Sequence, residues 1–301
     1  MKRLQAAALT VALLILATLL WRQWPDVRAL VVQADLRMLA ASWGLAIVLS
    51  VMAAHGWRLC LRAVAVDLSL GQAVYLWFVG SAARYVPGVV WSYASRTVLA
   101  SRMGIPAAAT ASSMYFETLV IAASSLAIGL PALVRGQQAS LSLTQAALAW
   151  VGICALLHPR VLGLARRLPG RPGQWFSRIP LPDARAVVLL YAYYSVYWIG
   201  FGFAFCLLAA AFSPLVWDNV VHVGATFALG YWLGFVVLLV PGGLGVREGA
   251  YYALLLLVLP SHSSLVIALA SRLWIMTAEA AMLIGISATA ALRGRAAPGP
   301  L

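Results

Sequence analysis

The run Val240-Pro241-Gly242-Gly243-Leu244-Gly245-Val246-Arg247-Glu248-Gly249 lies inside a long apolar stretch of the chain. Proline removes a backbone donor from a helix and glycine adds backbone freedom, so a helix is expected to break here. In hydrocarbon, every backbone group released by a break has to find another partner. Arg247 and Glu248 follow directly, and ionisable groups beside a broken helix at membrane depth are typical of a site that binds or passes a polar group.

The composition predicts an integral membrane protein. The 301 residues are 63% apolar and only 10% charged, with a mean hydropathy of +0.93. A soluble domain carries about 25% charged residues. The sequence contains no polar stretch long enough for a separate soluble domain, so we expect one integral membrane domain over residues 1–301.

The net charge of +13 is almost entirely due to arginine, because Lys2 is the only lysine. In a soluble protein this charge would suggest nucleic acid as a partner. In a membrane protein, basic loops on the cytoplasmic side set the orientation and lie near anionic lipid headgroups. Nucleic acid is therefore not an expected partner.

Apolar runs of a length suited to a bilayer of ~30 Å predict about six full transmembrane helices. These runs cover approximately residues 4–21, 38–57, 107–130, 143–157, 186–212 and 265–291. The first run follows Met1-Lys2-Arg3 and resembles a signal peptide. It is longer than a signal peptide requires and lacks a clear cleavage site, so we expect an uncleaved first span.

Two further apolar stretches, about 69–101 and 220–260, are interrupted by helix breakers. Arg84-Tyr85-Val86-Pro87-Gly88 interrupts the first stretch, and the run quoted above interrupts the second. Neither stretch is expected to form one straight helix.

The arginine positions predict the topology. The loop 158–185 holds six arginines against one acid, Asp183, and is expected to be cytoplasmic. Basic residues near both ends place the termini on the same side. The two interrupted stretches then each start and end on one side of the membrane, so we expect two re-entrant hairpins that enter from opposite faces.

The two hairpins resemble each other in sequence. Trp77 precedes Val86-Pro87-Gly88, and Trp232 precedes Val240-Pro241-Gly242. A span with a carboxylate follows each hairpin, and we expect this carboxylate, Glu117 or Glu279, to be buried. The predicted fold class is therefore an all-α polytopic membrane protein organised as an inverted repeat. Its binding site is expected to lie where the broken helices meet.

Carboxylates and arginines at membrane depth are the candidates for function. An ionised carboxylate at the position of Glu117 costs about 2.5–3.5 kcal/mol on insertion scales, so it should face protein, a cation or water. Arg272 and Glu279 share one helix face, two turns apart. Two interpretations remain open: Arg272, Glu279, Glu117 and Arg247 neutralise one another and hold the bundle together, or some of them line a polar path.

Three arginines flank the first break. The planar guanidinium can donate two parallel hydrogen bonds to a lipid phosphate, and Arg84 is the strongest candidate for this role. Arg96 and Arg102 are candidates of the same kind or ordinary cytoplasmic anchors. Helix N-termini after Gly88 and Gly245 would add exposed N–H donors for an anion.

No metal or cofactor is expected from the sequence. His55, His158, His222 and His262 are isolated near span ends without metal-ligand spacing, and we expect them to be interfacial. Cys60, Cys154 and Cys206 have no paired spacing and are expected to pack in apolar surroundings. The aromatic stretch 191–198 is predicted to face a lipid groove or to belong to the aromatic belt or the core.

The two breaks carry a resemblance to a known family. The first signature of the flippase-like family of the lysylphosphatidylglycerol synthase transmembrane region resembles residues 84–91, followed by Arg96 and Arg102-Met103-Gly104-Ile105. Its second signature resembles residues 241–248. The resemblance covers about residues 5–292. It includes Glu117 and the span that contains Arg272 and Glu279.

The resemblance implies a multi-pass protein of the bacterial inner membrane that moves a lipid between leaflets. The chain ends at Leu301 without a cytoplasmic aminoacyl-transferase domain, so lipid aminoacylation is not implied. Val89 stands where many relatives carry a basic or polar residue, which leaves the identity of the headgroup open. The residues expected to contact the lipid headgroup are Arg84, Tyr85, Pro87, Gly88, Arg96, Glu117, Pro241, Gly242, Gly243, Gly245, Arg247, Glu248, Arg272 and Glu279.

The leading hypothesis is a translocator of a phospholipid, glycolipid or polyprenyl-linked lipid that is not itself an enzyme. One alternative is a membrane-embedded glycosyl- or lipid-transferase that uses Glu117 or Glu248 as a base. Another is a scaffold for enzymes of lipid or glycan biosynthesis, which are also the expected protein partners. The sequence contains no nucleotide-binding loop, so transport is not expected to use ATP on this chain.

Overall fold

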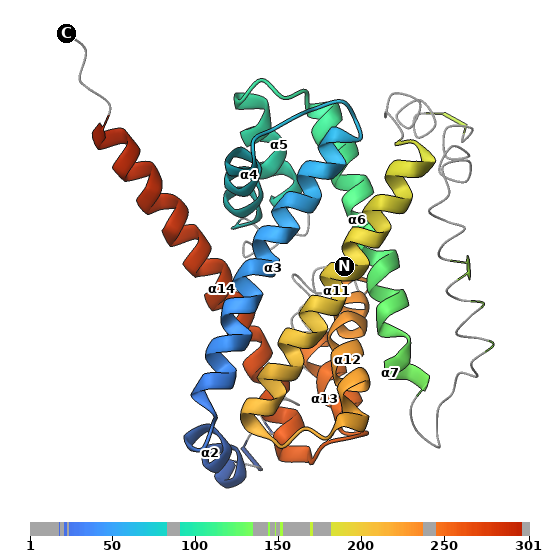
Figure 1. Ribbon diagram of the computed structural model, residues 1–301, viewed down its shortest axis with the longest axis vertical. Helices are drawn as coiled ribbons and strands as arrows, with labels where there is room; N and C mark the ends of the chain where they lie inside the picture. The colour runs from blue at the N-terminus through green and yellow to red at the C-terminus, as the bar shows by residue number, and fades with distance from the viewer. Residues whose placement is uncertain are drawn as a thin grey trace.

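The computed structural model describes residues 24–82, 91–134, 182–236 and 245–296, together with residues 18, 21, 22, 144, 148, 151, 152, 169 and 170. Within these residues the regular secondary structure is helical throughout (Figure 1). The expected all-α class is therefore confirmed.

Four helices in the described part of the chain are long and apolar enough to cross a membrane. They are α3 (Leu36–Arg62), α6 (Ala107–Gly129), α11 (Ala184–Phe212) and α14 (Ser261–Ala296). These helices correspond to four of the six expected spans. The other two, at about 4–21 and 143–157, lie almost wholly outside the described residues.

The two interrupted stretches form helices on either side of each predicted break. In the first stretch these are α4 (Leu70–Ala82) and α5 (Trp91–Arg102), and in the second they are α12 (Trp217–Val236) and α13 (Val246–Leu255). The breaks themselves, at 83–90 and 237–244, lie outside the described residues. At 1.5 Å per residue, α4, α5 and α13 are each too short to cross ~30 Å of hydrocarbon.

The described helices follow one order twice: a long helix, two helices around a break, and a second long helix. In the first set α3 packs on α4, α4 on α5 and α5 on α6, and in the second set α11 packs on α12, α12 on α13 and α13 on α14. Figure 1 shows α4 and α5 beside the C-terminal end of α3, whereas α12 and α13 lie toward the other end of the molecule. The two short helices α2 (Trp24–Val32) and α7 (Pro131–Val134) pack against α14 and α12 respectively.

Helix starts are fixed locally by capping residues. The carboxylate of Asp35 accepts a hydrogen bond of 2.8 Å from the amide of Arg37 at the start of α3. At the start of α11, Asp183 accepts one of 2.7 Å from the amide of Ala186. These bonds satisfy backbone donors that the first turn of a helix leaves without a partner.

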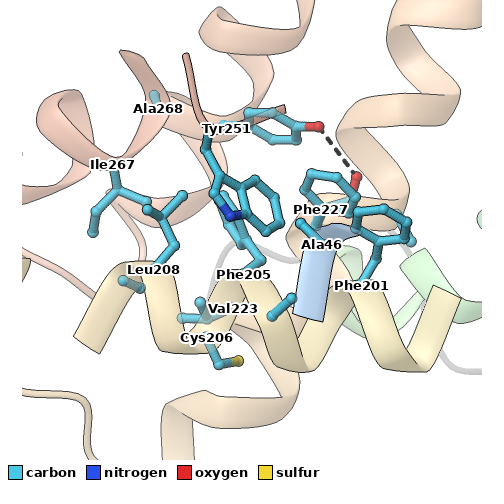
Figure 2. Close-up of a cluster of buried hydrophobic side chains, with 14 of the residues drawn as sticks. Ala46, Phe201, Phe205, Cys206, Leu208, Val223, Phe227, Tyr251, Ile267 and Ala268 are labelled. Carbon is cyan, nitrogen blue, oxygen red and sulfur yellow. Dashed lines mark hydrogen bonds between the residues drawn. The ribbon is translucent and has the colours of Figure 1, made fainter. Parts of the chain in front are cut away.

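The largest buried cluster joins α3, α11, α12, α13 and α14 and contains several aromatic rings. The ring of Phe227 lies nearly parallel to those of Phe201 and Tyr251, with centroids 5.2 and 5.7 Å away. The Tyr251 hydroxyl donates a bond of 3.5 Å to the Phe227 carbonyl (Figure 2). Each such ring pair contributes about 0.5–1.5 kcal/mol beyond the burial of its surface. This cluster fixes α13 against the helices that surround it.

The described cysteines and His222 are buried. Cys60 and Cys206 are buried as predicted, and Cys154 lies outside the described residues. His222, expected near the membrane interface, has a side chain that is only 1% exposed, and its Nε2 lies 2.8 Å from the Leu254 carbonyl oxygen. The backbone of α13 thus provides a hydrogen-bond partner that the sequence does not reveal.

Candidate functional site

A buried ion pair joins α5 to α6 beside the first break. Nη1 of Arg96 lies 2.8 Å from Oε2 of Glu117, and the two residues are only 7% and 6% exposed. A buried carboxylate or guanidinium alone is strongly unfavourable, so each charge stabilises the other here.

Polar side chains from three other helices complete this first cluster. Trp77 Nε1 on α4 donates to Oε1 of Glu117 at 3.2 Å, and the Tyr194 hydroxyl on α11 donates to the same oxygen at 3.4 Å. The guanidinium of Arg96 also donates to Ser81 Oγ at 2.9 Å and lies 5.0 Å from the Trp57 ring centroid. Both charges of the pair are thus surrounded by protein groups.

A glycine lets α4 approach the arginine of this pair. A Cβ built on Gly80 would lie 2.9 Å from the Cα of Arg96, which is closer than real Cβ contacts allow. The contact is with backbone, so it could be relieved only by moving α4 away from α5.

The second cluster lies at the start of α13, directly after the second break. Gly245 adopts a positive φ of 77°, and its amide donates a hydrogen bond of 2.7 Å to Oε2 of Glu248. The other carboxylate oxygen of Glu248 lies 3.7 Å from Nη1 of Arg272 on α14. Glu248 is 5% exposed, so this carboxylate both caps the broken helix and pairs with the next long helix.

The two ion pairs occupy corresponding positions with reversed charge. In the first set of helices the arginine is on the helix after the break and the carboxylate on the long helix that follows. In the second set the carboxylate, Glu248, is on the helix after the break and Arg272 is on the long helix.

The half-buried Arg247 differs from Arg96 in having no carboxylate partner among the described residues. Its guanidinium carbon lies 4.2 Å from the ring centroid of Tyr231 on α12. Its Nε, like that of Arg96, has no hydrogen-bond partner in the described part of the chain. A Cβ on Gly234 would lie 2.4 Å from the Arg247 side chain, so this glycine provides its space. Arg247 therefore has unused capacity to bind an anion.

Aromatic side chains connect the two clusters. Tyr194, which contacts Glu117, lies one turn before Trp198 on α11. The Trp198 indole donates to the Ile121 carbonyl at 3.3 Å, and its ring centroid lies 4.7 Å from that of Tyr231. Tyr194 and Trp198 are almost fully buried, so this part of the 191–198 stretch belongs to the core.

The predicted site residues other than Glu279 fall into three groups. The structure brings Arg96 together with Glu117, and Gly245 with Glu248 and Arg272. Arg247 lies beside this second cluster, over Tyr231. The predicted residues that lie outside the described part of the chain are Arg84, Tyr85, Pro87, Gly88, Pro241, Gly242 and Gly243.

The expectation of a buried Glu279 in the second set of helices is wrong. Glu279 is half-buried on α14, and the buried carboxylate is Glu248 on the shorter helix α13. Arg102 is exposed in the last turn of α5, which distinguishes it from the buried Arg96.

Sequence reasoning missed the aromatic partners Trp57, Tyr194 and Tyr231. The sequence did contain an indication of such partners, because the N–H of a buried tryptophan or the O–H of a buried tyrosine needs a hydrogen-bond partner. The sequence does not indicate which charged group each one meets. Among the described residues, no group of three or more histidine, cysteine or acidic side chains could hold a metal ion.

Comparison with known protein families identifies the family of this chain. The family model described as the lysylphosphatidylglycerol synthase transmembrane region matches residues 5–278. No curated protein matches the chain.

Proposed function

Because the chain belongs to the family of the lysylphosphatidylglycerol synthase transmembrane region, we propose that it translocates a lipid between the leaflets of the bacterial inner membrane. The family domain and the four long apolar helices make it a multi-pass membrane protein. The proposed cargo is a phospholipid, a glycolipid or a polyprenyl-linked lipid. Its headgroup would be held near the two breaks while its tails remain in the bilayer.

The observation that carries this proposal is the state of Arg247. A cation without a carboxylate partner among the described residues lies at the N-terminus of α13, where the helix dipole also favours a negative charge. A lipid phosphate would supply the missing counter-charge. Arg84, within the first predicted break, is the second residue proposed to contact phosphate.

The carboxylates have different proposed roles. Glu117 is neutralised by Arg96, and Glu248 is engaged by the Gly245 amide and Arg272. We assign both to holding the broken helices in position around the headgroup. Glu279, half-buried on α14, is the carboxylate proposed to face a cationic part of the headgroup.

The proposed architecture is an inverted repeat that relates α3–α6 to α11–α14. The repeated order of helices and the charge-reversed ion pairs support this relation. We further propose six spans, a cytoplasmic loop 158–185, both termini in the cytoplasm and two hairpins that enter the bilayer from opposite faces. Such repeats place the binding site at their interface near the middle of the bilayer.

The alternative of a membrane-embedded transferase is not favoured by the contacts of its candidate bases. A general base has to reach the proton that it removes, and both Glu117 and Glu248 already bind cationic or N–H groups. An assay for product release from a labelled polyprenyl-phosphate sugar would distinguish the two functions. A translocator would leave this substrate intact, whereas a transferase would convert it.

The proposed function is tested in vesicles that contain the purified protein and a headgroup-labelled phospholipid. A membrane-impermeant quencher added outside reports how fast label moves between leaflets. Arg247→Gln is expected to slow this movement, and Arg247→Lys to retain more of it because the charge remains. Arg37→Gln, which changes an exposed arginine near the start of α3, is the matched control. Unchanged movement in correctly inserted Arg247→Gln protein would remove this residue from the mechanism.

A further inference from the structure

An open groove of about 600 Å³ lies between α5 and α6. Ala94, Thr97 and Val98 line it from α5, and Ala111, Met114 and Thr118 line it from α6. Its walls are almost entirely apolar. In a membrane-spanning protein, an apolar surface that is open to the outside meets lipid chains.

The two ends of the groove differ in chemistry. At one end the Tyr93 hydroxyl lies 3.3 Å from that of Thr118, and the two groups satisfy each other. On α5 the lining of the groove ends at Val98, and Arg102 lies one turn beyond it on the same face of the helix. Arg102 is exposed, and no carboxylate of the described residues forms an ion pair with it.

The part of α5 from the groove residue Tyr93 to Arg102 is about as long as one leaflet is thick. Nine residues separate Tyr93 from Arg102 on α5, which corresponds to about 14 Å along a helix. Half of the hydrocarbon core of a bilayer is about 15 Å thick. A chain that begins at Arg102 and ends at Tyr93 would thus cross the hydrocarbon of one leaflet.

We propose that this α5–α6 groove binds one acyl chain of an anionic glycerophospholipid whose phosphate contacts Arg102. The arginine provides the charge that recognises the phosphate, and the groove separates the acyl chain from the neighbouring lipids of the bilayer. The residues that line the groove do not include Arg96 or Glu117, the buried ion pair described above. We also assign the groove a role as the entry site of the cargo. Only this second assignment rests on the proposed function.

The test uses full-length protein in phosphatidylcholine vesicles with a trace of phosphatidylglycerol that carries a photoactivatable group in the middle of one acyl chain. After irradiation, mass spectrometry locates the labelled peptides. We expect the label to concentrate on α5 and α6. Ala94→Trp should reduce this labelling by filling the groove, whereas Ala192→Trp, at an exposed alanine of α11, should leave it unchanged.

The role of Arg102 is tested by its glutamine variant and by a zwitterionic probe. Arg102→Gln should lower the labelling by phosphatidylglycerol about fivefold, the effect of one arginine near an anionic lipid surface. The same photoactivatable chain on phosphatidylcholine should lose less labelling in Arg102→Gln, because the cationic choline offsets the charge of its phosphate. Equal labelling of both proteins by phosphatidylglycerol would overturn the assignment of the phosphate to Arg102.

Other outcomes separate this proposal from the proposed function. Label spread evenly over α3, α11 and α14, or a cross-linked second copy in place of a lipid adduct, would overturn the groove as a lipid site. Groove labelling in a wild-type protein that moves no lipid between leaflets would support the groove and reject translocation. Full translocation by Ala94→Trp after loss of groove labelling would support lipid binding and overturn its role in entry.

Discussion

Arg96 on α5 and Glu117 on α6 form an ion pair of 2.8 Å inside the protein, and the corresponding step of the second set of helices carries a pair of opposite polarity. Glu248 on α13 and Arg272 on α14 lie 3.7 Å apart. Each pair ties the helix after a break to the next long helix. A charge buried alone is strongly unfavourable, so each pair stabilises the packing of these two helices against each other.

The first prediction concerns Glu117→Gln. The variant leaves the Arg96 guanidinium buried without a counter-charge, and the free energy of unfolding should fall by about 3–5 kcal/mol. Denaturant unfolding of the purified protein in detergent micelles measures this change. The matched control is Arg62→Gln, since Arg62 pairs with Asp67 at a similar 2.7 Å but in an exposed position. The free energy of unfolding of Arg62→Gln should change little. An equal loss of stability in both variants would show that the buried ion pair contributes no more than the exposed one.

The second prediction concerns the left-handed backbone of Gly245. Gly245→Ala should destabilise the start of α13 by about 1–2 kcal/mol, because a Cβ disfavours this conformation. Gly249 lies four residues later in the same helix, and a Cβ added there would meet no atom within 4 Å. Gly249→Ala should therefore be neutral or slightly stabilising. Thermal unfolding of the two variants side by side tests this, and a larger loss for Gly249→Ala would contradict the assigned conformation.

The third prediction isolates the capping role of Glu248. Glutamine retains an oxygen that can accept from the Gly245 amide, whereas alanine does not. Both variants remove the charge opposite Arg272, so their difference reports the cap and should amount to about 0.5–2 kcal/mol. Hydrogen exchange of the amides in the first turn of α13 should be faster in Glu248→Ala than in Glu248→Gln. Identical exchange in the two would mean that the hydrogen bond does not hold this turn.

The fourth prediction links Gly234 to Arg247. A Cβ at Gly234 would lie 2.4 Å from the flexible Arg247 side chain, so Gly234→Ala should move the guanidinium from Tyr231 without unfolding the helix. Loss of about 1 kcal/mol of cation–π stabilisation would slow lipid movement about fivefold if this position is needed for binding. Gly44→Ala, which meets no atom within 4 Å, is the control. Wild-type transport by Gly234→Ala would show that Arg247 acts from another position.

Local chemistry made much of the fold predictable. The interruption of both apolar stretches follows from proline and glycine in the chain itself, and α4, α5, α12 and α13 end or begin beside the predicted breaks. Four of the expected spans are helices at nearly the predicted positions, because length and hydropathy suffice to recognise them.

The partners of the charged residues were not predictable in the same way. The sequence suggested Glu279 as the buried carboxylate of the second set, yet Glu248 is buried there and Glu279 is half-buried. His222 likewise has a partner in α13, which follows it in the chain by about 30 residues. Helical spacing describes neighbours on one helix, and these contacts join different helices.

The sequence by itself determined that the chain is a helical membrane protein, where its long helices lie and where two of its apolar stretches break. These properties depend on hydrophobicity and on the backbone preferences of single residues. Only the tertiary structure decided that Arg96 is neutralised by Glu117 and that Glu248 lies between Gly245 and Arg272. It also decided that the guanidinium of Arg247 lies over the ring of Tyr231. The reason is that a buried charge is stabilised by whichever groups the packing of other helices brings within a few ångströms, and that packing depends on the whole chain.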